Sequence, residues 1–148
     1  MCPEASGIGC TLRPMTAADY PQVLALWQRS EGVGLGESDT ADAVARFLER
    51  NPGMSAVAES SAGEIVGAVL CGHDGRRGYL HHLAVSRAHR RQGIARRLVR
   101  FCFSGLAREK ILKCNVFVIR ESPDSIAFWT HNGWVAPAWQ IMQKRVDA

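Results

Sequence analysis

The residues 90–95, which read RRQGIA, have the composition of a phosphate-binding loop. Two arginines precede Gly93, and the small residues Gly93 and Ala95 would let a ligand approach the backbone closely. Apolar residues at helical spacing follow, so we expect a helix from about Gly93 to Arg108. The first amides of a helix lack internal partners and lie at its positive end, which attracts phosphate. The segment therefore predicts a site for a phosphorylated ligand.

A second group of residues suited to chemistry lies on an expected strand at 79–86, YLHHLAVS. His81 and His82 are adjacent, so we expect their side chains on opposite faces of the strand. Imidazole titrates near neutral pH, so either histidine could accept a proton from an acceptor group, directly or through water. Tyr79 would share a face with His81 and could position that water. The alternative is that one histidine is buried against a helix and the other is solvated.

Acidic residues gather in the glycine-rich segment 30–39, SEGVGLGESD. Its glycines do not form a dinucleotide fingerprint, because the segment follows a helix and the third glycine comes one residue early. Two interpretations remain. The segment is a flexible connection, or it is a mobile wall of a substrate site whose carboxylates bind an amine. In the second case the candidate substrate-binding residues are Glu31, Glu37 and Asp39.

The elements that must position these residues form one α/β (α+β) domain. Strands are expected at 10–15, 54–59, 64–73, 79–86, 111–119 and 139–146. Helices are expected at 16–29, from a cap at Ser38 or Asp39 to Arg50, at 93–108 and at 122–134. This order, β-α-α-β-β-β-α-β-α-β, predicts a central mixed, mostly antiparallel sheet flanked by about four helices. We expect a flexible N-terminus at 1–9 and a single domain at 10–148.

Composition restricts the class of protein. The chain has 148 residues, a formal net charge of +4 and a pI of about 9.0, which fits an anionic ligand. Five cysteines without a CxxC pair predict neither a metal site nor a disulfide framework, and Cys71, Cys102 and Cys114 are expected in the core. The sequence shows no membrane-crossing run and no secretory signal, so we expect a cytoplasmic protein.

A nucleic-acid-binding module is the main alternative class. It explains the arginines of segment 87–100, but a groove-binding helix has no need of Gly93 and Ala95 at its start. No pattern of aromatic residues suited to base stacking accompanies the basic segment. We therefore expect neither nucleic acid nor membrane as a partner, and a homodimer is compatible with the sequence. The acidic segment 30–39 favours a cationic small molecule, an amine, as the acceptor.

The residues 90–95 resemble the R/Q-x-x-G-x-G/A motif of the GNAT superfamily of N-acetyltransferases, which binds the pyrophosphate of acetyl-CoA. The preceding LHHLAVSRAHR is similar to that family's L-x-V strand, and the later FVIRESPDSIAFWTHNGW is similar to its N-x-x-A-x-x-F-Y-x-x-x-G-F segment. The order of elements is similar from about 10 to 146. The resemblance implies acetyl-CoA as co-substrate and direct acetyl transfer to an amine, in a ternary complex, with a small-molecule acceptor favoured. The alternatives are a protein or peptide N-acetyltransferase and a catalytically weak acyl-CoA-binding regulatory protein.

The resemblance also implies roles for particular residues. The strand at 79–86 would splay from its neighbour, and its backbone would pair with pantetheine, with an N–H near Leu83 polarising the thioester carbonyl. The implied cofactor-binding set is Leu83, Ala84, Val85, Arg90, Arg91, Gln92, Gly93, Ile94, Ala95, Arg96, Ser122, Ser125 and Phe128. Catalytic roles would fall to Tyr79, His81 and His82, and substrate binding to Glu31, Glu37, Asp39 and Trp129.

The sequence departs from the family pattern at two positions. Ser122 stands where the family often has asparagine, which would weaken or move one hydrogen bond to the cofactor. Trp129 stands where many members have a tyrosine thought to protonate the departing thiolate. Indole is not an acid near neutral pH, so that role is excluded, and water or a residue such as His131 would serve. The four tryptophans lie on separate elements, which favours core or rim packing over an aromatic cage.

Overall fold

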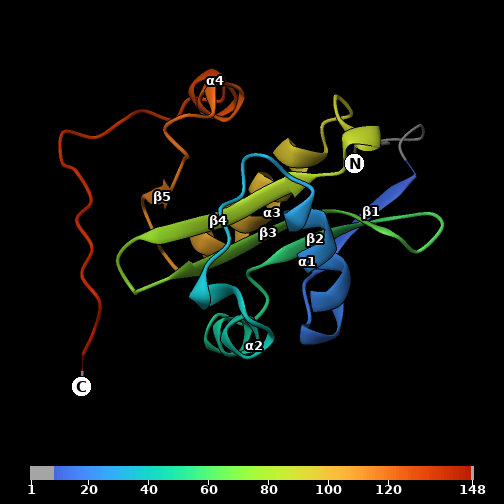
Figure 1. Ribbon diagram of the computed structural model, residues 1–148, viewed down its shortest axis with the longest axis horizontal. Coiled ribbons are helices and arrows are strands. Elements are labelled where there is room, and N and C mark those ends of the chain that lie inside the picture. The colour runs from blue at the N-terminus through green and yellow to red at the C-terminus, as the bar shows by residue number, and fades with distance from the viewer. Residues whose placement is uncertain (1–8, 148) are drawn as a thin grey trace.

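A computed structural model describes residues 9–147, which fold around a five-stranded sheet in the order β1-β2-β3-β4-β5 (Figure 1). β1 (Cys10–Pro14), β2 (Ala56–Ser60), β3 (Ile65–His73) and β4 (Gly78–Val85) pair antiparallel in sequence order. β5 (Cys114–Val116) is parallel to β4. The predicted α/β fold with a mixed, mostly antiparallel sheet is confirmed. The expected flexible N-terminus, apart from Gly9, lies outside the described residues.

Helices cover both faces of the sheet. α1 (Tyr20–Gln28) and α2 (Ala41–Arg50) lie on one face, and α3 (Ile94–Arg108) lies on the other (Figure 1). α4 (Pro123–His131) lies beyond the sheet, past the end of β5 and to the side of β4 (Figure 1). Because helices cover both sides, the middle of the sheet is buried on both faces. The sequence of β3 is accordingly an almost continuous apolar run.

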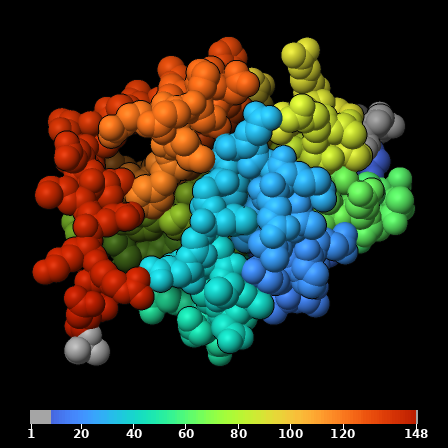
Figure 2. Space-filling model, viewed as in Figure 1, coloured from blue at the N-terminus to red at the C-terminus, as the bar shows by residue number. Residues whose placement is uncertain are grey.

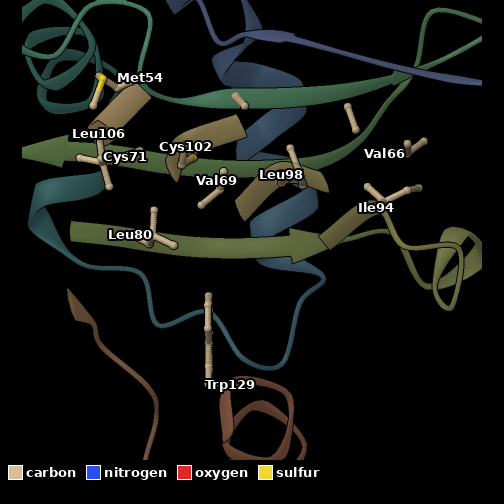
Figure 3. Packing of buried hydrophobic residues seen from close by; sticks show 12 residues of the cluster. Met54, Val66, Val69, Cys71, Leu80, Ile94, Leu98, Cys102, Leu106 and Trp129 are labelled. Carbon is tan, nitrogen blue, oxygen red and sulfur yellow. The ribbon is translucent and has the colours of Figure 1, made fainter. Parts of the chain in front are cut away.

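The core has two parts, one on each face of the sheet. On the α3 side, residues spaced four apart along the helix pack against strands β2, β3 and β4 (Figure 3); they are Ile94, Leu98, Cys102 and Leu106. On the other side, Val23, Leu26 and Trp27 of α1 pack against the sheet, and Trp27 is fully buried. Cys71 and Cys102 are buried and Cys114 packs against the same cluster, so their predicted place in the core is confirmed.

Of the two helix caps predicted near the N-terminus, one forms and the other does not. The predicted capping box forms, because the Thr16 backbone N–H donates to Oδ2 of Asp19 at 2.8 Å. The predicted cap of α2 at Ser38 or Asp39 is wrong. Residues Glu37–Asp39 form a 3₁₀ turn instead, and the Thr40 side chain accepts a hydrogen bond from the Ala43 backbone N–H at 3.2 Å. Asp39 is thereby left outside the helix.

The C-terminal part of the chain corrects the predicted order of elements. The strand expected at 111–119 shrinks to the three residues of β5. The strand expected at 139–146 is absent, and no strand forms between residues 132 and 147 (Figure 1). A strand needs a partner and a buried face, whereas Ile141, Met142 and Val146 are 59%, 85% and 95% exposed. The observed order of the longer helices and the strands is β-α-α-β-β-β-α-β-α.

Candidate functional site

The candidate site begins where β4 and β5 separate. The two strands pair only from Gly78 to Leu80, against Cys114 to Val116. Beyond Leu80 β4 continues to Val85 and keeps its pairing with β3 on the other edge. Among the described residues no strand lies against its β5-facing edge from His81 onward. This is the splayed gap that the sequence resemblance predicted.

The gap opens into a cavity of about 1100 Å³. Its walls come from the end of β4, the residues that follow β5, the start of α3, α4 and the loop before α2. Every predicted cofactor-binding residue except Gln92 lines this cavity. These residues are Leu83, Ala84, Val85, Arg90, Arg91, Gly93, Ile94, Ala95, Arg96, Ser122, Ser125 and Phe128. Residues far apart in the sequence are therefore brought to one continuous space.

The start of α3 forms the positively charged end of the cavity. Gly93 precedes the helix with a φ of 78°, and no side chain caps the first turn. This left-handed conformation is easy for glycine and unfavourable for a β-branched residue. Arg91 also has a positive φ, 63°, so the chain turns sharply into the helix. The uncapped amides of the first turn and the guanidinium groups of Arg90, Arg91 and Arg96 can together bind an anion.

A β-bulge interrupts β4 at His82 and Leu83. Ala84 pairs with Ala68 and His81 pairs with Leu70, so two residues of β4 stand opposite one residue of β3. His82 has a φ of 56°. The prediction that His81 and His82 point to opposite faces is wrong, because the extra residue breaks the alternation of the strand. Their ring centroids are 6.4 Å apart, and both side chains border the same cavity.

Three contacts hold His82 in this unusual conformation. Its Nε2 atom lies 2.8 Å from Oδ1 of Asp39. Its backbone carbonyl accepts a hydrogen bond from Trp27 Nε1 at 3.0 Å, and the two rings meet edge to face at 5.0 Å. A non-glycine residue in the left-handed region costs on the order of 1 kcal/mol or more. These contacts offset that cost and fix the shape of the bulge.

His81 lies in an aromatic cluster. Its ring stacks on Phe117 at 5.4 Å and meets Phe47 edge to face at 5.9 Å. Tyr79 shares its face of β4, as predicted, and stacks on it at 6.4 Å, although Tyr79 does not border the cavity. Burial lowers the pKa of His81 below its ordinary value, the charge of His82 lowers it further, and Asp39 opposes the shift. His81 is therefore neutral at pH 7.

The glycine-rich loop 30–36 crosses the cavity to α4. A side chain at Gly32 would place its Cβ atom 2.7 Å from Oγ of Ser125, so only glycine fits without a shift. Ser125 is oriented in turn by Ser122, whose hydroxyl donates to its Oγ at 2.8 Å. Figure 2 shows the loop, in light blue, running along the face of the molecule to the orange segment that contains α4. The loop is thus a wall of the cavity.

The three acidic residues of the loop have different environments. Glu31 borders the cavity and is paired with Arg87 at 3.0 Å, in an exposed position. Asp39 binds His82, as described above. Glu37 lies outside both cavities and is paired with Arg145 at 2.8 Å. The structure therefore brings Glu31 and Asp39 to the site and leaves Glu37 away from it.

Trp129 is part of the core as well as a wall of the cavity. It is 8% exposed and meets the rings of Phe128 and Trp134 at 5.0 and 4.8 Å. Figure 3 shows its side chain projecting from α4 toward the sheet. Packing of this kind was favoured for the tryptophans, and it is confirmed for Trp27 and Trp129. Trp139 is 65% exposed.

A second cavity, of about 530 Å³, adjoins the first. The two share the lining residues His81, His82 and Phe117. The remaining wall comes chiefly from α2, which contributes Arg46, Phe47 and Arg50. These residues were not predicted to be functional from the sequence. Two arginines at i and i+4 on a helix are a weak signal, because charged residues at this spacing are common on the exposed face of helices.

Two negative findings hold for the described part of the chain. No group of three or more His, Cys, Asp or Glu side chains there could hold a metal ion. No helix there is long and apolar enough to span a membrane.

Comparison with known proteins gives the family. Residues 20–134 match the model of the acetyltransferase (GNAT) family. An acetyltransferase of Yersinia enterocolitica is 31% identical over 115 residues, which cover 78% of this chain and 79% of that protein. Another, of Photorhabdus laumondii, is 34% identical over 88 residues, which span 60% of each protein. The chain belongs to the acetyltransferase (GNAT) family, as its motif predicted.

A solved structure supports the same fold. Ard1 from Thermoplasma volcanium superimposes with a TM-score of 0.77 at 20% identity, over 88% of this chain and 86% of that one. At this level of identity the likeness concerns the fold and not the substrate. The acceptor must therefore be argued from the site itself.

Proposed function

We propose that this protein transfers the acetyl group of acetyl-CoA directly to an amine, and that the acceptor is a small molecule. The observation that carries the proposal is the continuity of one cavity from the gap beside β4 to the positive end of α3. Membership of the GNAT family supports the choice of co-substrate.

The residues of the cavity fit acetyl-CoA, a long ligand with anionic and less polar parts. The amides from Arg91 to Arg96 would hold the pyrophosphate at the start of α3. The backbone of Leu83 to Val85 would pair with the pantetheine arm along the open edge of β4. His89 supports a polar ligand here, because its Nδ1 atom is buried at the cavity wall without a hydrogen-bond partner among the described residues. When bound, acetyl-CoA supplies an acetyl group activated as a thioester.

His81 is the residue that we propose as the proton acceptor. An amine attacks only in its neutral form, so a base must take its proton. His81 is neutral at pH 7, and its ring nitrogens make no hydrogen bond within the described residues. It also lies where the two cavities meet, between the proposed cofactor site and the space open to an acceptor. His82 is assigned a positioning role, because its ring is bound to Asp39.

No side chain needs to protonate the departing thiolate. The Trp129 N–H is not an acid near neutral pH. A thiolate whose ordinary pKa is about 8.5 is a good leaving group and can take its proton from water. The absence of tyrosine at this position is therefore compatible with turnover.

The test is a turnover assay with purified protein, acetyl-CoA and a metabolite extract. We expect CoA release together with acetylated amines, identified by mass spectrometry. Binding of acetyl-CoA without any acetylated product would contradict the proposal and favour the alternative of a regulatory acyl-CoA-binding protein.

A further inference from the structure

We infer that the acceptor carries an anionic group, a carboxylate or a phosphate, in addition to its amine, and that Arg46 and Arg50 bind that group in the second cavity. This inference rests on the proposed acetyl transfer and adds the chemical class of the acceptor.

The position of the second cavity makes it the acceptor site. It meets the proposed cofactor cavity at His81, His82 and Phe117. A molecule in the second cavity would therefore lie beside the proposed base, which also borders the proposed cofactor cavity. Its volume of about 530 Å³ lies within the range of small-molecule sites, roughly 300 to 1000 Å³.

The charge of the second cavity favours an anion. Five ionisable residues line it, namely Asp39, Arg46, Arg50, His81 and His82. The Asp39 carboxylate is hydrogen-bonded to His82, and His81 is neutral. Within residues 9–147, the guanidinium groups of Arg46 and Arg50 make no ion pair and no hydrogen bond. They lie one turn apart on α2 and so share a face of the helix. Both guanidinium groups are exposed to solvent, and they are the charged groups of this cavity without a protein partner among the described residues.

The ion pairs and hydrogen bonds of the acidic residues do not favour a purely cationic acceptor. Each acidic residue of the loop already has a partner: Arg87 for Glu31, Arg145 for Glu37 and His82 for Asp39. A second positive charge on the acceptor would instead lie near two arginines. The planar guanidinium group matches the oxygens of a carboxylate or a phosphate, and two of them on one face can hold one such group.

The wall between the two ends of the cavity is largely apolar. Phe47, Leu70 and Phe117 line the second cavity together with the arginines and the histidines. Phe47 and Phe117 each contact the His81 ring. An acceptor would thus place its amine at His81, run a short hydrocarbon portion along the aromatic wall, and end in an anion at α2. Amino acids and aminoalkyl phosphates have this chemistry.

The first test compares pairs of acceptors with and without the anionic group. Rates of CoA release would be measured for glycine, β-alanine and 4-aminobutyrate against their amides, and for phosphoethanolamine against ethanolamine. The acetylated products from the metabolite extract would be identified alongside. We expect the anionic member of a pair to have a kcat/KM about 10- to 100-fold higher, and the extract products to carry an oxyanion. The two arms distinguish carboxylate from phosphate.

The second test uses variants of α2. Arg46→Gln and Arg50→Gln should each raise KM for anionic acceptors about tenfold or more and so reduce the preference for them over neutral amines, while the Kd of acetyl-CoA stays unchanged. Arg46→Lys should restore part of the loss because it keeps the charge. Arg108→Gln, at the exposed end of α3 and outside both cavities, is the control and should change nothing.

The outcomes separate the inference from the proposed function. Acetylation of neutral or cationic amines at rates equal to or above those of anionic ones, insensitive to both arginine variants, would overturn the inference and leave acetyl transfer standing. A complete lack of acetylated products despite bound acetyl-CoA would overturn both.

Discussion

The Nε2 atom of His82 lies 2.8 Å from Oδ1 of Asp39, across 43 positions of sequence. The other carboxylate oxygen of Asp39 accepts a hydrogen bond from the Gly36 backbone N–H at 2.8 Å. One side chain therefore joins the loop before α2 to the bulge of β4. Because the bulge sets the direction of the Leu83 backbone, the loop takes part in shaping the proposed thioester site.

Loss of the Asp39 carboxylate should impair turnover more than cofactor binding. Asp39→Ala frees the His82 ring and the loop, and misplacement of groups near the reacting centre can lower kcat by up to about 100-fold. Asp39→Asn should recover only part of the rate, because its single amide oxygen can take the place of only one of the two carboxylate oxygens that contact His82 and Gly36. Steady-state kinetics and calorimetric Kd values for acetyl-CoA would check both.

Glu37→Ala is the matched control for Asp39, since Glu37 lies in the same 3₁₀ turn but outside both cavities. It should have near-normal kinetics. Equal loss of kcat in Asp39→Ala and Glu37→Ala would show that the loop, and not the contact with His82, is what matters.

His81 should determine the acid limb of the rate profile. Its pKa in the folded protein is lowered, and its neutral form is the active one. At saturating acceptor, kcat should therefore rise with pH and level off below about pH 6.5, the ordinary value for histidine. His81→Gln should remove this limb and lower kcat by about 10²- to 10⁴-fold. A limb that persists unchanged in His81→Gln would assign the base elsewhere.

The same shift has a consequence for stability. The folded state takes up the His81 proton less readily than the unfolded state, because the folded pKa is the lower of the two. The wild type should therefore lose stability relative to His81→Gln as pH falls through and below about 6.5, and the two should differ least above that pH. Denaturant unfolding at a series of pH values would measure this difference.

Gly93 should be essential for binding acetyl-CoA. Gly93→Val puts a β-branched residue at a φ of 78° and adds methyl groups at the start of α3, in the proposed phosphate site. We expect binding to be lost by calorimetry. Gly63→Val is the control: Gly63 has a φ of 81° and open space around it in the turn between β2 and β3. It carries the same backbone cost but should bind normally. Retained binding in Gly93→Val would contradict the placement of the pyrophosphate.

The proposed cofactor side of the site has signals that are local in the sequence. One stretch of sequence contains an apolar strand, then a glycine, and then an amphipathic helix. The helix begins one residue from where it was expected. The splayed gap followed from the resemblance to a known family. Ser125 and Phe128 of the later segment also line the predicted cavity.

The acceptor side was not predictable because its contacts are distant in sequence. The bulge at His82 carries no glycine or proline, so HHLAV looks like an unbroken strand. The bond to Asp39 depends on how the loop is placed by α1 and α2. Arg46 and Arg50 look like ordinary surface charges until β4 and Phe117 are brought beside them. The strand expected at 139–146 fails for a similar reason. Its apolar and polar residues alternate, but no neighbouring element buries the apolar face.

Trp129 should matter for stability and not as an acid. Trp129→Ala would leave a cavity beside Phe128 and Trp134 and should lower the free energy of unfolding by about 3 to 5 kcal/mol. Trp129→Phe keeps an aromatic ring in the core, so the loss should be smaller and kcat should stay near the wild-type value. Trp139→Ala, at a position 65% exposed, is the control and should change stability little. A large fall in kcat for Trp129→Phe, with normal stability and normal acetyl-CoA binding, would instead give the indole N–H a direct role in the reaction.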